Sequence, residues 1–583
     1  MRDERVLRVL ARQHDEVDDG WLCDKGRFAY QAIHVDERIT APMIRDGGEL
    51  RAVSWERALS EAAGGLRRAG ARTAALAGAG ASNEEGLLLG RLLRDVLASP
   101  HLDSRATGAV ALEEWRALAA PALAASVSDL EFAHAVLVLD CEPIDAAPIL
   151  ELRIRKGVRR NGVALAVATD RPSALDPQAT TTLRFAPGRG AELAGALAAV
   201  LRGEDEGADD LAALAQTLRD AGPEVVILYG ERLLDGGAAG LLALADGLGL
   251  AGTPGAGLIG IPDAANGRGL REAGVLPNGG PGLADAPLGD GLDAPAIAAA
   301  LHAGELTAVY LLGVDPLRDL PDRAAWEDAL EHATTVIVHA AFLSDTIREH
   351  ASVVFPSESA AEKEGTVTHP DGRVQRLRPA IARQGEVRAE WSVLSELATR
   401  LGAERAALSG AAASAALFEA VPFYNDLTLA ELAGHGVRWP ARPQAAALAA
   451  GGAVAREPRP APAPPRGRLR LGTHRSIWAA PEVEASPALH FLRARQRVEV
   501  NPADAAALRL RHGAQMLVLD ETGASVVAEV ALRHTTPAGT AFLERGLSEH
   551  GANALRGQTV RIVPIPEPEP EPEHQAEVEE ALA

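Results

Sequence analysis

The stretch Thr307-Ala-Val-Tyr-Leu-Leu-Gly313-Val-Asp315-Pro316 decides the fold class. It begins as a short apolar run and continues into a Gly/Asp/Pro turn and a helical segment. The same order of run, turn and helix recurs at Arg72–Gly78, Ala135–Asp140, Val163–Thr169, Glu224–Gly230, Thr334–His339 and Ser352–Phe355. Buried runs that alternate with helices are typical of parallel sheets covered on both faces. The sequence therefore predicts an α/β protein with two doubly wound parallel sheets.

The order of these runs predicts how the chain divides into domains. The strand at Thr307–Gly313 is expected to return to the first sheet, so the first lobe is discontinuous, and the Val225–Leu228 strand is expected to open the second set. After the proline-rich linker Glu457–Arg466, short strands separated by turns predict a small β-barrel. The predicted units are 51–175 with 305–405 (first lobe), 176–304 (second lobe), 406–466 (helical region and linker), 467–566 (barrel) and 567–583 (a disordered Pro-Glu tail).

Composition and charge argue against several classes of protein. The 583 residues include 58 basic and 80 acidic side chains, a net charge of −22, which repels phosphate and disfavours nucleic-acid binding. Cys23 and Cys141 are the two cysteines, so a disulfide scaffold, a CxxC zinc site or a complete cysteine-ligated cluster cannot be built from this sequence. The sequence contains neither a secretory signal nor a long apolar run, so we expect a cytoplasmic chain with no direct membrane span.

Two strand–turn–helix edges are candidate ligand sites. Gly78-Ala-Gly80-Ala-Ser82-Asn83 and Gly313-Val-Asp315-Pro316 each follow a predicted strand and precede a helix. Such edges aim backbone N–H groups at anionic ligands. Gly78 and Gly80 do not complete the GxGxxG pattern of dinucleotide-binding proteins, so a simple tight connection is the alternative interpretation.

A third candidate is the polar loop from Glu358 to Gln375, which contains Lys363, Gly365, Thr366 and Arg373. Polar, glycine-bearing loops at the carboxyl ends of strands are where α/β proteins bind ligands. The alternative is a solvated loop or a β-hairpin around the Pro-Asp-Gly sequence at 370–372.

The remaining reactive side chains give weaker signals. Cys23 stands beside Lys25 and Arg27, and basic neighbours favour a thiolate, although an inert thiol is the simpler interpretation. The histidines form no HxxxH or HExxH pattern, which disfavours zinc, and no GxSxG nucleophile is present.

Several motifs together resemble one known family. They are Asp19-Gly-Trp-Leu-Cys23-Asp-Lys-Gly-Arg-Phe-Ala-Tyr30, Val353-Val-Phe-Pro356 with Glu362-Lys-Glu-Gly-Thr366 and Asp371-Gly-Arg-Val-Gln375, Ala265-Asn-Gly-Arg-Gly269, and Leu471–Val483. They resemble the molybdopterin oxidoreductase superfamily and, within it, the large iron–sulfur subunit (the G subunit) of bacterial NADH:quinone oxidoreductase (complex I) in its actinobacterial form. The resemblance covers nearly all of residues 1–566 and makes residues 1–50 a remnant of the segment that carries a [4Fe-4S] cluster.

This resemblance implies a respiratory-chain oxidoreductase subunit that takes part in electron transport from NADH to quinone, but the sequence departs from the family twice. The family's C-x2-C-x3-C cluster motif is missing, so Cys23 is the single remaining ligand position, and the ferredoxin-like part that carries further clusters is missing as well. Thr107 and Gly108 stand where molybdenum enzymes of the superfamily place a Cys, selenocysteine or Ser ligand. We therefore expect a structural lobe with no catalytic residue and no bound molybdopterin guanine dinucleotide, and either a fragment or a split subunit.

If the dinucleotide binds, the resemblance implies that its site is formed by Lys25, Gly78, Gly80, Ser82, Asn83, Gly313, Asp315, Lys363, Gly365, Thr366, Arg373, Gln375, Thr473, His474 and Arg475. The implied partners are other subunits of the complex I hydrophilic arm, including a separate iron–sulfur chain, at the cytoplasmic side of the plasma membrane. Two alternatives stay open. One is an active molybdenum enzyme similar to formate dehydrogenase or nitrate reductase, and the other is a nucleotide-binding regulatory module.

Overall fold

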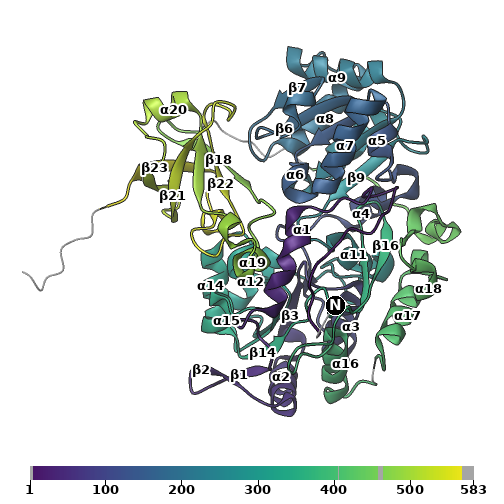
Figure 1. The fold of residues 1–583 in the computed structure, drawn as a ribbon, viewed down its shortest axis with the longest axis vertical. Helices are drawn as coiled ribbons and strands as arrows, with labels where there is room; N and C mark the ends of the chain where they lie inside the picture. The colour runs from purple at the N-terminus through teal and green to yellow at the C-terminus, as the bar shows by residue number, and fades with distance from the viewer. Residues whose placement is uncertain (1–3, 405, 457–463, 567–583) are drawn as a thin grey trace, which may run out of the picture.

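The computed structural model describes residues 4–404, 406–456 and 464–566. The predicted tail and most of the predicted proline linker lie outside the described residues. Two α/β lobes and a barrel make up most of the molecule, and the N-terminal segment runs across the front of the view between them (Figure 1).

The first lobe is built on a mixed seven-stranded sheet. Its strands, in order across the sheet, are β2 (Glu49–Ala52), β1 (Met43–Asp46), β14 (Val353–Pro356), β13 (Thr335–Ala340), β12 (Ala308–Leu312), β3 (Thr73–Ala77) and β4 (Leu102–Asp103). The strands from β14 to β4 are parallel, and β1 and β2 add an antiparallel edge.

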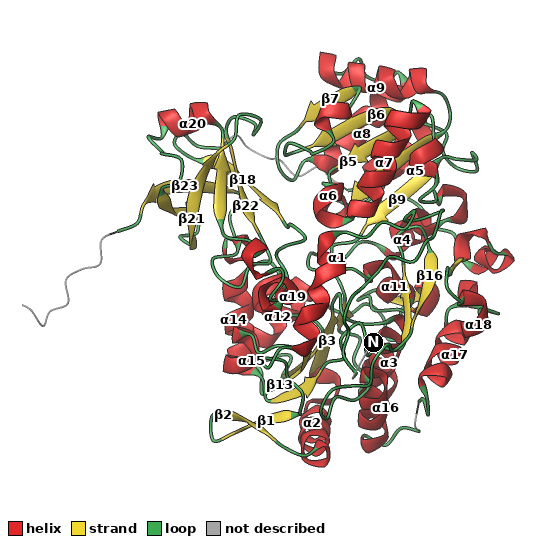
Figure 2. Cartoon of the chain, in the orientation of Figure 1, coloured by secondary structure: helices red, strands yellow, loops and turns green. Residues whose placement is uncertain are grey.

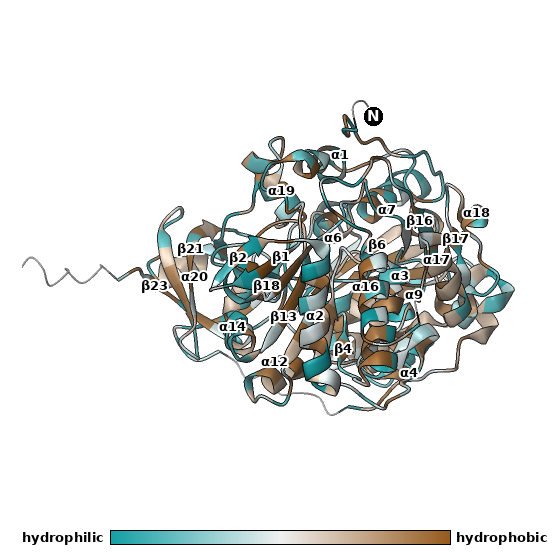
Figure 3. Ribbon diagram, turned by 90° about the horizontal axis from the view of Figure 1, so that it is seen from below, coloured by the Kyte–Doolittle hydropathy of each residue, from teal (hydrophilic) through white to brown (hydrophobic). Residues whose placement is uncertain are grey.

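Helices cover both faces of this sheet because its strands alternate apolar side chains between two cores. Tyr310 and Leu312 face α2 (Trp55–Ala69), α3 (Asn83–Arg91) and α16 (Glu390–Arg400). Val309 and Leu311 face α12 (Ala294–His302), α14 (Arg323–His332) and α15 (Asp345–His350). Figure 3 shows β13 largely brown, whereas α2 and α14 carry teal residues on part of their surface.

The second lobe is a fully parallel five-stranded sheet (Figure 2). Its strands, in order, are β7 (Thr181–Arg184), β6 (Ala164–Thr169), β5 (Ala135–Leu139), β8 (Val225–Gly230) and β9 (Gly257–Ile261). The helices against its two faces are α8 (Gly190–Arg202), α9 (Asp209–Ala221) and α10 (Ala239–Gly247) on one side, and α5 (Asp129–Phe132) and α7 (Pro148–Asn161) on the other.

The strand order of this sheet shows that the expected boundary between the two lobes is wrong. β5 and β6 were expected in the first lobe, but β5 pairs with β8, so the second sheet begins at Ala135 and not near residue 176. The strand β12 pairs with β3 and thus belongs to the first sheet. Strands that are buried on both faces are apolar throughout, whichever sheet they belong to. The sequence of such a strand therefore does not show which strand it pairs with.

Two smaller β units complete the fold. β15 (Gly365–Thr368), β16 (Arg373–Leu377) and β17 (Val437–Arg438) form an antiparallel sheet beside α11 (Gly267–Glu272) and α17 (Gly410–Ala420). The predicted barrel is confirmed as a closed one with the order β18 (Leu469–His474), β22 (Thr540–Glu544), β19 (Arg497–Val500), β21 (Ser525–Leu532), β20 (Gln515–Asp520) and β23 (Thr559–Pro564). The predicted fold class is therefore confirmed.

Short helices join these units, and some of them line the cleft. They include α1 (Asp24–Phe28), α4 (Leu112–Ala119), α6 (Pro143–Ala146), α13 (Pro316–Asp319), α18 (Leu429–Leu432), α19 (Pro481–Ala485) and α20 (Pro502–Ala507). Ser486, just after α19, donates a hydrogen bond to the backbone carbonyl of Phe28, which joins the barrel unit to the N-terminal segment. Among the described helices, none has the length and apolar character needed to cross a bilayer.

Candidate functional site

The central cleft is a cavity of about 1710 Å³ at the carboxyl ends of strands from both sheets. Gly78 follows β3, Gly313 follows β12 and His339 lies near the end of β13, all in the first lobe. Asp140 follows β5, and Asp170 follows β6 in the second lobe. Because the strands of a parallel sheet end at one edge, a single crevice collects all of these turns. Its volume exceeds the roughly 300–1,000 Å³ of a typical small-molecule pocket.

The first-lobe edge is shaped by two glycine turns in close contact. A Cβ atom on Gly78 would lie 2.3 Å from the carbonyl oxygen of Gly313, and Gly313 has φ +63°, so both positions favour glycine. Asp315 caps α13 by accepting a hydrogen bond from the N–H of Leu317 at 3.1 Å. Burial raises the pKa of Asp315. Gly78, Gly80, Gly313 and Asp315 thus line the cavity, while their role in binding stays a prediction.

The second-lobe edge holds an arginine between two buried carboxylates. Arg232 lies 2.5 Å from Asp140 Oδ1 and 2.7 Å from Asp170 Oδ1, and it also donates to the backbone oxygen of Thr473 in the barrel at 3.3 Å. Burial raises the pKa of Asp140 to about 7. Asp140 has φ +52°, a left-handed conformation that aspartate adopts more readily than most residues other than glycine. Arg232 therefore links the second lobe to the barrel through its hydrogen bond to Thr473.

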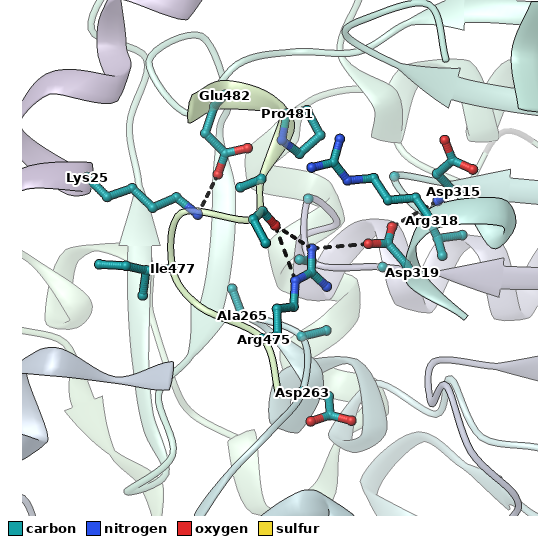
Figure 4. A pocket seen from close by; sticks show the side chains of 18 of the residues that line it. Lys25, Asp263, Ala265, Asp315, Arg318, Asp319, Arg475, Ile477, Pro481 and Glu482 are labelled. Carbon is teal, nitrogen blue, oxygen red and sulfur yellow. Dashed lines mark hydrogen bonds and ion pairs between the residues drawn. The ribbon is translucent and has the colours of Figure 1, made fainter. Parts of the chain in front are cut away.

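The barrel closes the cleft with Thr473, His474 and Arg475, as the resemblance implied. Arg475 pairs with Asp319 at 3.1 Å, as Figure 4 shows. His474 is half-buried, and desolvation of its ring together with nearby arginines holds its pKa well below the usual range. Its Nδ1 atom has no hydrogen-bond partner among the described residues. A neutral, unsatisfied imidazole nitrogen on the wall is free to bind a polar ligand.

Carboxylates neutralise the cations along this cleft. Lys25 Nζ lies 2.9 Å from Glu482 Oε1 (Figure 4). Further paired cations include Arg171 with Glu499 (3.2 Å), Arg318 with Glu484 (2.9 Å) and Arg545 with Asp263 (3.0 Å). These pairs link the N-terminal segment and both lobes to the barrel unit. An incoming diphosphate would compete with these carboxylates for the cations.

Part of the predicted site lies elsewhere, and the prediction that the Lys363–Gln375 segment completes the cleft is wrong. The residues placed away from the cavity wall are Ser82, Asn83, Lys363, Gly365, Thr366, Arg373 and Gln375. Ser82 caps α3 in a capping box with Glu85, and Asn83 donates to Thr366 Oγ1 at 3.2 Å. These polar groups bond one another and fix the β15–β16 hairpin onto α3.

Lys363 is the centre of this internal network. Its Nζ atom lies 2.8 Å from Glu85 Oε2 and also pairs with Glu390. Burial acts to lower the pKa of Lys363, but the charges of Glu390 and Glu85 outweigh that effect and raise it. Burial raises the pKa of Glu85 to about 8. Arg373 pairs with Glu16 at 2.8 Å, and Gln375 lies in β16 opposite Val367.

The donor set does not fit a [4Fe-4S] cluster. Cys23 is half-buried at the start of α1, where its Sγ atom accepts a hydrogen bond from the Gly26 N–H at 3.4 Å. The other cysteine, Cys141, lines the cavity and donates to the carbonyl oxygen of Leu228 at 3.6 Å. A [4Fe-4S] cluster needs four protein ligands, typically cysteines, and this chain contains two cysteines in separate environments.

Thr107, at the position expected for a metal ligand, is hydrogen-bonded to other side chains. Thr107 Oγ1 donates to Asp235 at 2.6 Å and accepts from Arg105 at 2.8 Å. Arg105 in turn pairs with Glu231 at 2.7 Å. Only residues 103–106 of this segment line the cavity. The residues present therefore do not fit a protein-ligated metal at this position.

The cavity does fit the organic part of a dinucleotide cofactor. The cavity is large enough for such a group. Its wall also carries polar atoms that have no hydrogen-bond partner in the described structure, among them Asp170 Oδ2, Glu142 Oε1, Ser357 Oγ and Ser359 Oγ. Such atoms can bind hydroxyl and ring N–H groups. Sequence reasoning missed Asp170, Arg171, Arg232, Arg318 and Arg545. Asp170 and Arg171 follow a predicted strand directly, and that position was the available signal.

Comparisons with known proteins agree with this architecture. The Molybdopterin oxidoreductase family model matches residues 38–400, and the Molydopterin dinucleotide binding domain matches residues 469–564. A third model, the 4Fe-4S domain of NADH-ubiquinone oxidoreductase NDSU1/NuoG-like proteins, matches residues 1–31. The chain belongs to the molybdopterin oxidoreductase family.

Individual relatives show which members of the family are similar to this chain. The G subunit of NADH-quinone oxidoreductase from Mycobacterium tuberculosis is 35% identical over 408 residues, which cover 65% of this chain and 48% of that protein. The NADPH-Fe(3+) oxidoreductase subunit alpha of Geobacter sulfurreducens is 28% identical over 97% of this chain and 72% of its own length. Acetylene hydratase from Pelobacter acetylenicus has the same fold, with a TM-score of 0.67 at 14% identity, covering 93% of this chain and 92% of that one. The chain is a homologue of the NADH-quinone oxidoreductase G subunit and spans about half the length of the mycobacterial relative.

Proposed function

We propose that this chain is the molybdopterin-oxidoreductase-like lobe of an NADH-quinone oxidoreductase G subunit and that it acts there as a scaffold without its own redox centre. In this role the whole complex passes electrons from NADH to quinone, and this chain holds the cluster-bearing parts in place. Residues 1–50 are then the remnant of the cluster segment, and residues 467–566 are the barrel that covers the cleft.

The observation that carries this proposal is the bonding of Thr107. Its hydroxyl is held between Asp235 and Arg105, and Arg105 is itself buried and paired with Glu231. A metal at this position would have to break that network, and the lone Cys23 supplies no cluster beside it. Electron transfer through the cleft then lacks both a metal ligand and a neighbouring centre.

The ion pairs around the cleft support a scaffold role. Arg318 and Glu484 form two hydrogen bonds, at 2.9 and 3.0 Å, between the first lobe and the barrel unit. Arg171 and Glu499 join the second lobe to the barrel. Bidentate arginine–carboxylate pairs are geometrically specific, so they fix the barrel relative to the lobes. A fixed body of this size suits a part that positions neighbouring subunits.

The partners that follow from this proposal are the other hydrophilic-arm subunits of the complex, including a chain that carries the iron–sulfur clusters. The location that follows is the cytoplasmic side of the plasma membrane, reached through the complex. If a dinucleotide does bind, Lys25, Gly78, Gly80, Gly313, Asp315, Thr473, His474 and Arg475 are the residues that would hold it. That group would supply a metal-binding dithiolene, and the chain's own residues would position its phosphates.

Affinity purification of the tagged chain from its native host tests the assembly claim. The scaffold role predicts that hydrophilic-arm subunits co-purify and that the preparation has NADH:quinone activity. It also predicts that Thr107→Val changes neither. Recovery of the chain without those subunits would overturn the proposal.

An active molybdenum enzyme is the second candidate, favoured by the unpartnered polar atoms on the cavity wall. It predicts that the purified chain reduces a dye with formate or oxidises one with nitrate, and that Thr107→Val abolishes this turnover. The scaffold role predicts no such turnover in either protein.

A further inference from the structure

A group of metal-ligating side chains lies on the outer surface of the first lobe, at the ends of two neighbouring helices. α12 and α14 pack side by side against one face of the seven-stranded sheet (Figure 1). α12 ends at His302 and α14 ends at His332. Asp328 lies one turn before His332 on the same face of α14. The two histidines are far apart in the sequence, and the packing of the helices brings them together.

The three side chains converge closely. His302 Nδ1 pairs with one carboxylate oxygen of Asp328, and His332 Nδ1 lies 3.6 Å from the other. The two imidazole rings are 5.0 Å apart between centroids. One ligand atom from each residue lies within 4.8 Å of the other two. Ligands of a tetrahedral Zn²⁺ at bond lengths of 2.0–2.1 Å are about 3.3 Å apart, so small rotations of exposed side chains close the site.

The surroundings of the three side chains favour a bound cation. His332 Nδ1 lies 2.8 Å from the backbone carbonyl oxygen of Asp328. A hydrogen bond donated there leaves the Nε2 lone pair for a metal, which is the arrangement that orients metal-ligating histidines. Both helices also point their negative C-terminal ends at this surface, and the negative ends of helix dipoles attract cations.

A second group of possible metal ligands in the molecule differs because a lysine already pairs with it. Glu85, Glu358 and Glu390 also bring carboxylate oxygens within 4.8 Å of one another, but Lys363 already pairs with Glu85 and Glu390 and provides the cation there. The His302–Asp328–His332 group has solvent access, with side chains 59%, 45% and 49% exposed.

We propose that His302, Asp328 and His332 form a surface site for Zn²⁺ or a similar divalent transition metal, with two nitrogen ligands, one oxygen ligand and an open fourth position for water. The mixed nitrogen and oxygen set suits Zn²⁺ and disfavours Mg²⁺ and Ca²⁺, which prefer oxygen ligands alone. The ion crosslinks the C-terminal ends of α12 and α14, and binding to the folded chain alone stabilises it. This site lies outside the cleft and is independent of the proposed scaffold role.

Titration of the full-length, tag-free chain with ZnCl₂ tests the site. We expect wild-type protein to bind one Zn²⁺ and to gain thermal stability from it. The variants His302→Ala and His332→Ala should lose at least about tenfold in affinity, since even outer-shell partners of metal ligands are worth about 10- to 100-fold. His534→Ala, which removes an exposed histidine of the barrel unit, is the matched control and should bind as wild type does.

Cobalt gives a second readout that does not depend on stability. Co²⁺ in the wild-type protein should show the strong visible absorption of a four-coordinate site, and either histidine variant should lose it. Three results would overturn the proposal: no Zn²⁺ bound by wild type, equal binding by both histidine variants, or loss of binding in His534→Ala. In those cases the group is a surface ion pair between Asp328 and a histidine.

Discussion

Replacing Lys363 by methionine tests whether this lysine is part of the folded core or of a ligand site. Lys363 is buried, and it is the cation that pairs with Glu85 and with Glu390, which lines the cleft. Methionine keeps the length of the side chain but leaves two buried carboxylates without their partner. Removing one member of a buried ion pair typically costs about 3–5 kcal/mol, because the remaining charge is uncompensated.

Urea denaturation followed by tryptophan fluorescence measures this cost, since Trp55 and Trp391 lie in the core packed against the same sheet. We expect Lys363→Met to lower the free energy of unfolding by about 3–5 kcal/mol. Lys25→Met is the matched control. Lys25 and Glu482 are partly exposed, so their pair should contribute no more than about 1 kcal/mol.

A rescue experiment separates the loss of charge balance from the loss of packing. Adding Glu85→Gln and Glu390→Gln to Lys363→Met removes the uncompensated charges, so most of the lost stability should return. The reasoning is refuted if Lys363→Met costs less than the Lys25→Met control, or if the glutamine changes destabilise the methionine variant further.

Other predictions concern pH, the barrel contacts and the two thiols. Burial and the nearby Glu390 charge raise the pKa of Glu358 to about 7, so the folded chain keeps a proton that the unfolded chain loses above pH 4.5. Glu358 should therefore contribute a loss of about 3 kcal/mol of stability as the pH rises from 4.5 to 7, and in urea titrations over this range the stability of Glu358→Gln should fall less than that of wild type by about this amount. Arg318→Ala breaks the contact with the barrel unit, and hydrogen exchange of residues 481–492 should become faster than in wild type. Burial raises the pKa of the Cys141 thiol, so mass spectrometry after iodoacetamide treatment at pH 8 should find Cys23 modified first.

Local sequence patterns predicted the fold class because each buried strand is followed by its own turn and helix. They could not predict which sheet a strand joins. β5 and β6 have the same continuous burial as β12 and β13, and only pairing in three dimensions separates them. The barrel was predicted from a change of period and from turn spacing, both of which are local features.

The candidate site was predictable where glycine turns follow strands. Gly78 and Gly313 lie on the cavity wall because each directly follows a strand that ends at this edge of the sheet. The part of the polar loop from Lys363 to Gln375 was wrongly assigned to the wall, since a sequence does not show whether polar side chains face a ligand or one another. Local spacing also missed the His302–His332 group, because two separate helices bring its members together.

Metal content and electron paramagnetic resonance of the purified chain test the central claim most directly. The cells should be grown with molybdate, tungstate and iron, so that any centre the chain can hold is filled. A scaffold without a redox centre predicts neither molybdenum nor tungsten in stoichiometric amounts, and no signal from a reduced [4Fe-4S] cluster. One molybdenum or tungsten atom per chain, or a cluster signal from this polypeptide alone, would contradict it.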